Sequence, residues 1–167
     1  MKLNRKTRTQ GFSLIELLIV VTIILILAAI AIPKLLTVKQ TANATAAVAN
    51  TKSLLQALTA YQSQYNEYPA ALTDLGGAAG TAPTATGAEL VDNTLADAGT
   101  TPFQGYSFAY TPVAGTGGLN DSFTMTISPS STASGNRYFF TDDSDVIRWN
   151  DGAAATGSSP PIGTNAT

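Results

Sequence analysis

The chain has 167 residues, which is room for about one domain, and only 12% of them are charged. It contains neither His nor Cys, which excludes disulfides, thiolate nucleophiles, catalytic triads with His, and zinc sites built on Cys or His. With 9 basic against 11 acidic residues it also lacks the positive surface of a nucleic-acid-binding protein, so we expect no enzyme, no cofactor and no directly bound nucleic acid.

The first charges along the chain are positive and precede a long apolar run. Four basic residues lie before position 10: Lys2, Arg5, Lys6 and Arg8. Residues 12–32 follow, and their only polar members are Ser13, Glu16 and Thr22. About 20 apolar residues can cross a bilayer as a helix. Basic residues in front of such a helix favour a cytoplasmic N-terminus.

Glu16 is the residue that a simple membrane segment does not explain. A cleaved secretory signal with Ala29 and Ala31 at its processing site is one alternative, and a plain membrane anchor is another. An ionised carboxylate within an apolar helix costs about 2.5–3.5 kcal/mol at mid-bilayer, and less toward the helix end. Such a residue is therefore a candidate for function.

The segment from Arg8 to Glu16 resembles the class III leader junction of the type IV pilin and pseudopilin superfamily. The features that match are a short basic leader ending in Gly11, then Phe12, and Glu16 four residues later. A long apolar helix follows, with Pro33 where the family has its helix-bending proline. The resemblance covers roughly residues 5–40.

This resemblance implies that the chain is processed, held in the membrane and then assembled into a filament. A prepilin peptidase would cut between Gly11 and Phe12 and methylate the Phe12 amine. The subunit would wait in the bacterial inner membrane as a single-pass protein with its N-terminus inside. An assembly platform with an ATPase motor would then move it into a filament with itself and other pilins, as a homo- or hetero-polymer. There Glu16 would pair with the Phe12 amine of a neighbour, because a buried carboxylate needs an opposite charge.

The pattern after the apolar run predicts that the N-terminal helix continues beyond Pro33. Large apolar residues recur at spacings of 3 and 4, which is typical of one helix face: Val48, Leu54, Leu55, Leu58, Tyr61 and Tyr65. Asn66 and Pro69 predict the end of the helix. We expect a cleaved leader at 1–11, a transmembrane and filament-core helix at 12–35, a globular domain at 36–150 and a flexible tail at 151–167.

The globular part is predicted to be α+β. Residues 70–102 are rich in Ala, Gly and Thr and predict a loop with a short turn near Leu72–Leu75. Alternating apolar residues and turn residues then predict strands at 106–111, 123–128, 137–141 and 145–149. The expected fold is a long N-terminal α-helix, its first half transmembrane, packed on a small antiparallel sheet of three to four strands.

Three acidic residues gather in the last predicted turn: Asp142, Asp143 and Asp145. Carboxylates bind calcium, so they are weak candidates for a calcium site. The spacing matches no ligand pattern, and Asp is common in turns for local hydrogen bonding. An ordinary acidic turn is the favoured interpretation, with no metal.

Two functions remain open, and both use the same processing. One is a structural subunit of a type IV pilus-like filament, which serves adhesion, twitching motility or DNA uptake outside the cell. The other is a pseudopilin of a type II secretion system, in a periplasmic pseudopilus. The segment Tyr61–Leu75 looks like that of major pseudopilins, and many pilins have a disulfide that this chain lacks. A membrane-anchored enzyme or binding domain is the least favoured hypothesis.

Overall fold

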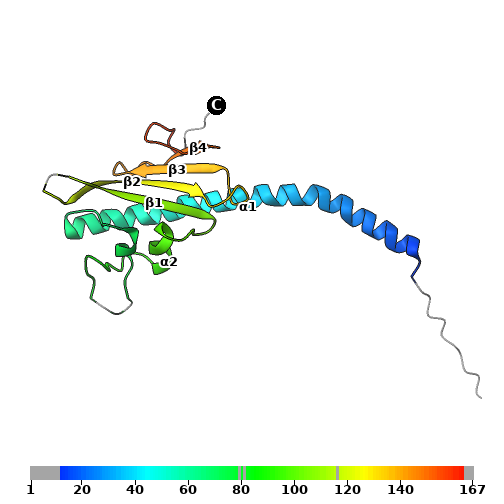
Figure 1. The fold of residues 1–167 in the computed structure, drawn as a ribbon, viewed down its shortest axis with the longest axis horizontal. Coiled ribbons are helices and arrows are strands. Elements are labelled where there is room, and N and C mark those ends of the chain that lie inside the picture. The colour runs from blue at the N-terminus through cyan, green and yellow to red at the C-terminus, as the bar shows by residue number, and fades with distance from the viewer. Residues whose placement is uncertain (1–11, 79, 81, 116, 164–167) are drawn as a thin grey trace, which may run out of the picture. The chain divides into compact units, whose positions relative to one another are not determined.

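The computed structural model describes residues 12–163 except 79, 81 and 116. One long helix, α1 (Leu14–Tyr65), is followed by short helices and a four-stranded sheet (Figure 1). The short helices are η1 (Leu72–Leu75), α2 (Asn93–Ala96) and η2 (Asp97–Gly99). The strands are β1 (Tyr106–Ala114), β2 (Asn120–Pro129), β3 (Arg137–Asp142) and β4 (Arg148–Asp151). The chain forms two compact units, Met1–Thr37 and Val38–Thr167, and α1 contributes to both.

Helix α1 ends where the sequence predicts. Asn66 has a φ of 59°, the left-handed conformation in which many helices terminate. Pro33 lies inside the helix, and the Thr37 hydroxyl donates a hydrogen bond of 3.2 Å to the Pro33 carbonyl. A proline inside a helix removes one backbone donor and crowds the preceding turn. The bend at Pro33 stays a prediction.

The sheet is an antiparallel meander in the order β1-β2-β3-β4. Its registers place Phe108 opposite Ile127, and Ile127 opposite Phe139, so these three buried side chains share one face. Side chains alternate between the two faces of a strand. This explains why the alternation of apolar and polar residues predicted β1, β2 and β3. The predicted α+β fold, with a long helix and a small antiparallel sheet, is confirmed.

In the core of the second unit, the apolar face of α1 packs against the sheet. Leu54 and Leu58 of α1 are fully buried in one cluster with the inner face of the sheet. Figure 1 shows the strands beside the C-terminal part of α1. Burying a Leu side chain contributes about 1.5–3 kcal/mol. The predicted apolar face of the helix is confirmed. Small buried residues that the pattern did not include also lie in the helix: Ala47, Thr51 and Ala57.

The segment between the helix and the sheet is more ordered than its composition predicts. Leu72 and Leu75 are buried, as are Ala88, Ala96 and Ala98. The Asn93 side chain makes two hydrogen bonds with the Gly77 backbone, each 2.9 Å long. The expected turn at Leu72–Leu75 is present, whereas α2 and η2 were not predicted. Small buried alanines and side-chain amide hydrogen bonds produce no periodic pattern of large apolar residues in the sequence. The prediction of a loop was therefore wrong at α2 and η2.

The last strand begins later than the predicted range 145–149. Asp145 has a φ of 58° and belongs to the turn, and β4 starts at Arg148. The chain after β4 also differs from the free tail that composition predicts for 151–167. Ile162 donates a backbone hydrogen bond of 2.8 Å to Ile147, and Ala155 is buried. The described part of this segment therefore packs along β4.

Candidate functional site

The N-terminal half of α1 exposes apolar side chains almost throughout. The Phe12 side chain is 82% exposed. The large apolar residues from Leu14 to Val38 are between 45% and 87% exposed. The helix has the length and composition of a membrane span, and its most apolar stretch has no residue buried in the protein. Soluble monomers rarely expose apolar patches of this size, so this surface needs lipid or another protein to cover it.

Glu16 is held at the very start of α1 by the backbone. The Ser13 amide donates a hydrogen bond of 2.9 Å to Oε2 of Glu16. Ser13 precedes the first helical residue and Glu16 occupies the third helical position, so the carboxylate satisfies one of the free amides at the helix N-terminus. A carboxylate at this end also interacts favourably with the helix dipole.

The other polar side chains of the apolar run behave differently from Glu16. The Thr22 hydroxyl donates a hydrogen bond of 2.7 Å to the Leu18 carbonyl of its own helix. Its polarity is therefore satisfied without any partner molecule. Glu16 is an acidic residue, and its second carboxylate oxygen has no hydrogen bond among the residues that the structure describes.

The predicted processing residues lie at and beyond the limit of the structure. Gly11 falls outside the described residues. Phe12 is the first described residue and lies just before α1, with its side chain in the open. The order Phe12, Ser13, then the helix places Phe12 and Glu16 at the same end of α1.

The acidic turn uses its carboxylates for local hydrogen bonds. Oδ1 of Asp142 accepts hydrogen bonds from both the amide and the hydroxyl of Ser144. The Asp145 amide donates to the Asp142 carbonyl over 3.1 Å. Within the described ranges, no group of three acidic residues could hold a metal ion. These contacts are those of an ordinary acidic turn, and the calcium site stays untested.

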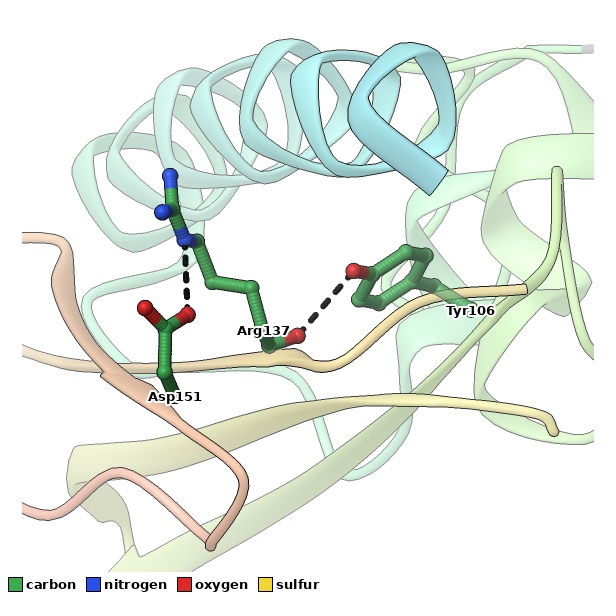
Figure 2. Close-up of polar contacts among 3 residues, drawn as sticks. All are labelled: Tyr106, Arg137 and Asp151. Atoms are coloured by element: carbon green, nitrogen blue, oxygen red, sulfur yellow. Dashed lines mark hydrogen bonds and ion pairs between the residues drawn. The ribbon is translucent and has the colours of Figure 1, made fainter. Parts of the chain in front are cut away.

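One polar cluster was not found by sequence reasoning. The Tyr106 hydroxyl donates to the Arg137 carbonyl over 3.0 Å, and Nε of Arg137 lies 3.0 Å from Oδ1 of Asp151 (Figure 2). The Arg137 guanidinium carbon also lies 4.6 Å from the centre of the Trp149 ring. Burial raises the pKa of Tyr106, although the nearby Arg137 charge lowers it in part. The strand register brings these residues together, and no motif in the sequence marks them.

Comparison with known proteins identifies the N-terminal segment. The family description "Prokaryotic N-terminal methylation motif" matches residues 6–32. The type IV wide pilus major component PilA4 of Thermus thermophilus is 46% identical over 70 residues. The match covers 40% of this chain and 53% of the relative, so the chain spans about half the length of that protein. No solved structure is significantly similar. The methylation motif and this relative support the resemblance of the chain to the type IV pilin superfamily.

Proposed function

We propose that this protein is a structural subunit of a type IV pilus-like filament, without enzymatic activity. The observation that carries the proposal is the exposed apolar half of α1, which no part of the described chain covers. In the membrane, lipid would cover this surface. In a filament, the same helices of neighbouring subunits would cover it. The relative with a related segment is a major component of a pilus.

Processing precedes assembly in this proposal. A prepilin peptidase cleaves after Gly11 and methylates Phe12 while the basic leader lies in the cytoplasm. Positive residues before a membrane helix favour that orientation. The new amine then lies at the same end of α1 as Glu16, separated from it by four positions. An assembly platform and its ATPase motor extract the subunit from the inner membrane.

Glu16 sets the axial position of a joining subunit. Among the described residues from Leu14 to Ile32, Glu16 is the only ionisable one. It is therefore the only residue of this segment that needs a cation when the filament buries it away from water. The Phe12 amine of the neighbour supplies that cation. Leaving one member of a buried pair alone costs about 3–5 kcal/mol, so a subunit docked one turn out of register would be unstable.

A pseudopilin of a type II secretion system is the alternative. The absence of Cys and the segment Tyr61–Leu75 favour it. The relative that is a pilus component favours the pilus. Both share the processing, the membrane stage and the polymer. Adhesion, twitching motility and DNA uptake are the roles that a surface filament would serve.

The test is to shear cells that express the protein and collect the fibres. Mass spectrometry should show a chain that begins at methylated Phe12. Long surface fibres that contain it would support the pilus, and a protein confined to the periplasm would support the pseudopilus. A mature chain that begins near Ile32 would mean an ordinary signal peptide and would refute both.

A further inference from the structure

The four-stranded sheet has two outer strands, β1 and β4 (Figure 1). Beside β4, the Trp149 amide donates to the Pro160 carbonyl over 3.0 Å. The Ile162 amide donates to the Ile147 carbonyl over 2.8 Å, so the chain itself covers this edge. Along β1, the described residues outside the sheet form backbone hydrogen bonds only with Tyr106. An uncovered edge is a template on which another chain can add a strand.

The hydrogen bonds of Tyr106 show which backbone groups of β1 point away from β2. The Tyr106 amide donates to the Phe103 carbonyl over 3.0 Å, and the Tyr106 carbonyl accepts from the Phe103 amide over 2.7 Å. In an antiparallel strand, the amides and carbonyls of alternate residues point to the same side. Phe108, Tyr110 and Pro112 therefore also present their backbone to the outer edge. Pro112 fits this side because it has no amide hydrogen to donate to β2.

The open part of this edge is short, and Pro112 lies within it. At one end, η2 lies beside the strand, since a Cβ added at Gly99 would be 3.6 Å from the Phe108 carbonyl oxygen. At the other end, the β1–β2 register is irregular just before Ala114, which breaks the regular ladder. Between these limits only Tyr110 and Pro112 face outward. Because proline has no amide hydrogen, the Tyr110 amide is the one backbone donor of this open edge.

The side chains of β1 do not protect its edge. The strand carries no charged residue, and its exposed outer positions include Thr111 and Val113. Aromatic and β-branched residues favour strands, and an uncharged run of them is prone to pair with copies of itself. Natural proteins commonly protect an edge with charged side chains, proline or an irregularity in the strand. In β1 the protection comes from Pro112 and from the irregular register at the end of the strand.

We propose that Pro112 closes the β1 edge to the β1 edge of a second copy of this chain. A two-fold axis at Thr111 would place the two strands antiparallel, with Tyr110 of each copy opposite position 112 of the other. With an amide at position 112, each such pair would exchange both backbone hydrogen bonds. Pro112 removes half of these bonds and leaves each Tyr110 carbonyl facing the partner without a donor. An unsatisfied polar group costs more than a missing bond alone.

A second copy is the partner that this edge has to exclude. A symmetric contact needs no complementary sequence elsewhere, because each β1 strand presents the same groups to the other. The exposed apolar half of α1 is a surface through which copies can meet. With the β1 edge closed, such a meeting leaves the sheets of the two copies apart. The inference concerns any two copies in contact and does not depend on the filament.

The test uses the full chain in a zwitterionic detergent, which covers the exposed half of α1. Pro112→Val restores the amide with an apolar side chain that favours strands, and circular dichroism checks that the variant folds. Light scattering over a dilution series should show that Pro112→Val dimerises at least about tenfold more tightly than the natural chain. Pro83→Val, which changes an exposed proline outside the sheet, should not. A Pro112→Val variant that associates no more than the natural chain would overturn the proposal.

A cysteine at the two-fold position identifies the contact, because the chain has no Cys of its own. Thr111 is exposed, and the Cα atoms of two such opposed residues lie about 4.5 Å apart, which a disulfide can bridge. Thr111→Cys combined with Pro112→Val should form a disulfide-linked dimer under mild oxidation. Thr126→Cys, exposed on β2 one strand away from the edge, should not do so in the same background. Equal yields from the two positions, or from Thr111→Cys with Pro112 intact, would contradict the proposal.

Two further variants separate the backbone amide from the side chain. Pro112→Thr also restores the amide, so it should associate as Pro112→Val does, and association of the valine variant alone would overturn the proposal by showing an apolar contact. Thr111→Lys, added to Pro112→Val, places like charges opposite each other and should return the chain to its natural behaviour. If both position-112 variants unfold, Pro112 is required by the fold itself, and its assignment to the closed edge fails.

Discussion

The Tyr110 hydroxyl donates a hydrogen bond of 2.9 Å to the carbonyl oxygen of Pro69, which ties strand β1 to the chain just after α1. Phe123 stacks on the Tyr110 ring and meets the Tyr68 ring edge-on. The Tyr68 amide also donates to the Asn120 carbonyl over 2.9 Å. The exit of the long helix is thus joined to the first two strands by aromatic packing and hydrogen bonds.

Tyr110→Phe should destabilise the protein at neutral pH and weaken its response to alkali. The lost hydrogen bond costs about 1 kcal/mol. Burial raises the pKa of Tyr110, with smaller contributions from Tyr68 and Asp74. The unfolded chain therefore loses this proton first, above about pH 10, and stability falls as the pH rises further. Denaturant unfolding between pH 7 and 11 should show a shallower alkaline loss in the variant, because its residue 110 cannot ionise.

Tyr138→Phe is the matched control for this experiment. Tyr138 is half-buried in β3, and its hydroxyl has no hydrogen bond among the described residues. This variant should keep the neutral stability of the natural chain, because it removes no hydrogen bond among the described residues. An identical slope in Tyr110→Phe and the natural chain would show that Tyr110 ionises equally in both states.

Gly135→Ala should disturb the cluster of Figure 2. A Cβ at Gly135 would lie 2.5 Å from the Tyr106 hydroxyl oxygen, which is fully buried and bonded to Arg137. Overpacking of this kind costs about 1–3 kcal/mol. Gly157→Ala is the control, since its Cβ would lie 3.6 Å from the Phe140 ring, an ordinary contact. Thermal unfolding of the two variants should separate them clearly, and equal midpoints would show that the Tyr106 ring can move aside.

Removing the chain after β4 should weaken the second unit. Three hydrogen bonds join this segment to residues 147–149: Trp149 to Pro160, Ile162 to Ile147, and Arg148 to Ser159. At about 1 kcal/mol each, their loss should cost at least about 2 kcal/mol. We expect a fragment of residues 38–167 to fold and one of residues 38–151 to be less stable in urea. Equal midpoints would support the flexible tail that composition predicts.

The parts of the fold that follow from the sequence are those with a strong periodic pattern. Leu54, Leu58 and Tyr61 lie on one helix face whatever packs against them, and Phe123, Met125 and Ile127 lie on one strand face. Asp145 shows the limit of this reasoning. It precedes a β-like run, yet its left-handed backbone belongs to the turn that its hydrogen bond to Asp142 closes, and β4 begins at Arg148.

The sites divide in the same way. Phe12 and Glu16 could be proposed because rare residue types stand at a fixed spacing next to an apolar run. Tyr106, Arg137 and Asp151 could not, since they come from three strands and meet only through the sheet register. Long-range pairing of this kind depends on the whole fold and not on local pattern.

Gly11→Val should block processing. A peptidase that accepts Gly before its cut needs a narrow site there, and a β-branched side chain adds bulk that cannot rotate away. We expect the full-length precursor to accumulate in the membrane fraction, with its leader attached and no methyl group on Phe12. Lys6→Gln, within the leader, is the control and should be cleaved. Intact mass spectrometry distinguishes the forms, and a normal mature mass for Gly11→Val would place the cut elsewhere.

Glu16→Ala should insert in the membrane and be cleaved after Gly11, but it should form at least about tenfold less filament. In the proposed filament this variant would leave the neighbouring Phe12 amine without a partner, and an unpaired buried charge costs about 3–5 kcal/mol. The measurement is the ratio of sheared fibre to membrane-bound protein in cells with the assembly machinery. Glu67→Ala, which removes a partly exposed acid just beyond the end of α1, should assemble normally.

Glu16→Gln separates the cap of α1 that the structure shows from the pairing that we propose for this carboxylate in the filament. The glutamine side chain has a carbonyl oxygen that can still accept the hydrogen bond from the Ser13 amide, but it carries no charge. If Glu16 mattered only as a cap of α1, Glu16→Gln would restore assembly fully. If the charge sets the position of the joining subunit, Glu16→Gln stays defective and is at best intermediate between Glu16→Ala and the natural chain. Full assembly by Glu16→Ala itself would remove the carboxylate from the mechanism altogether.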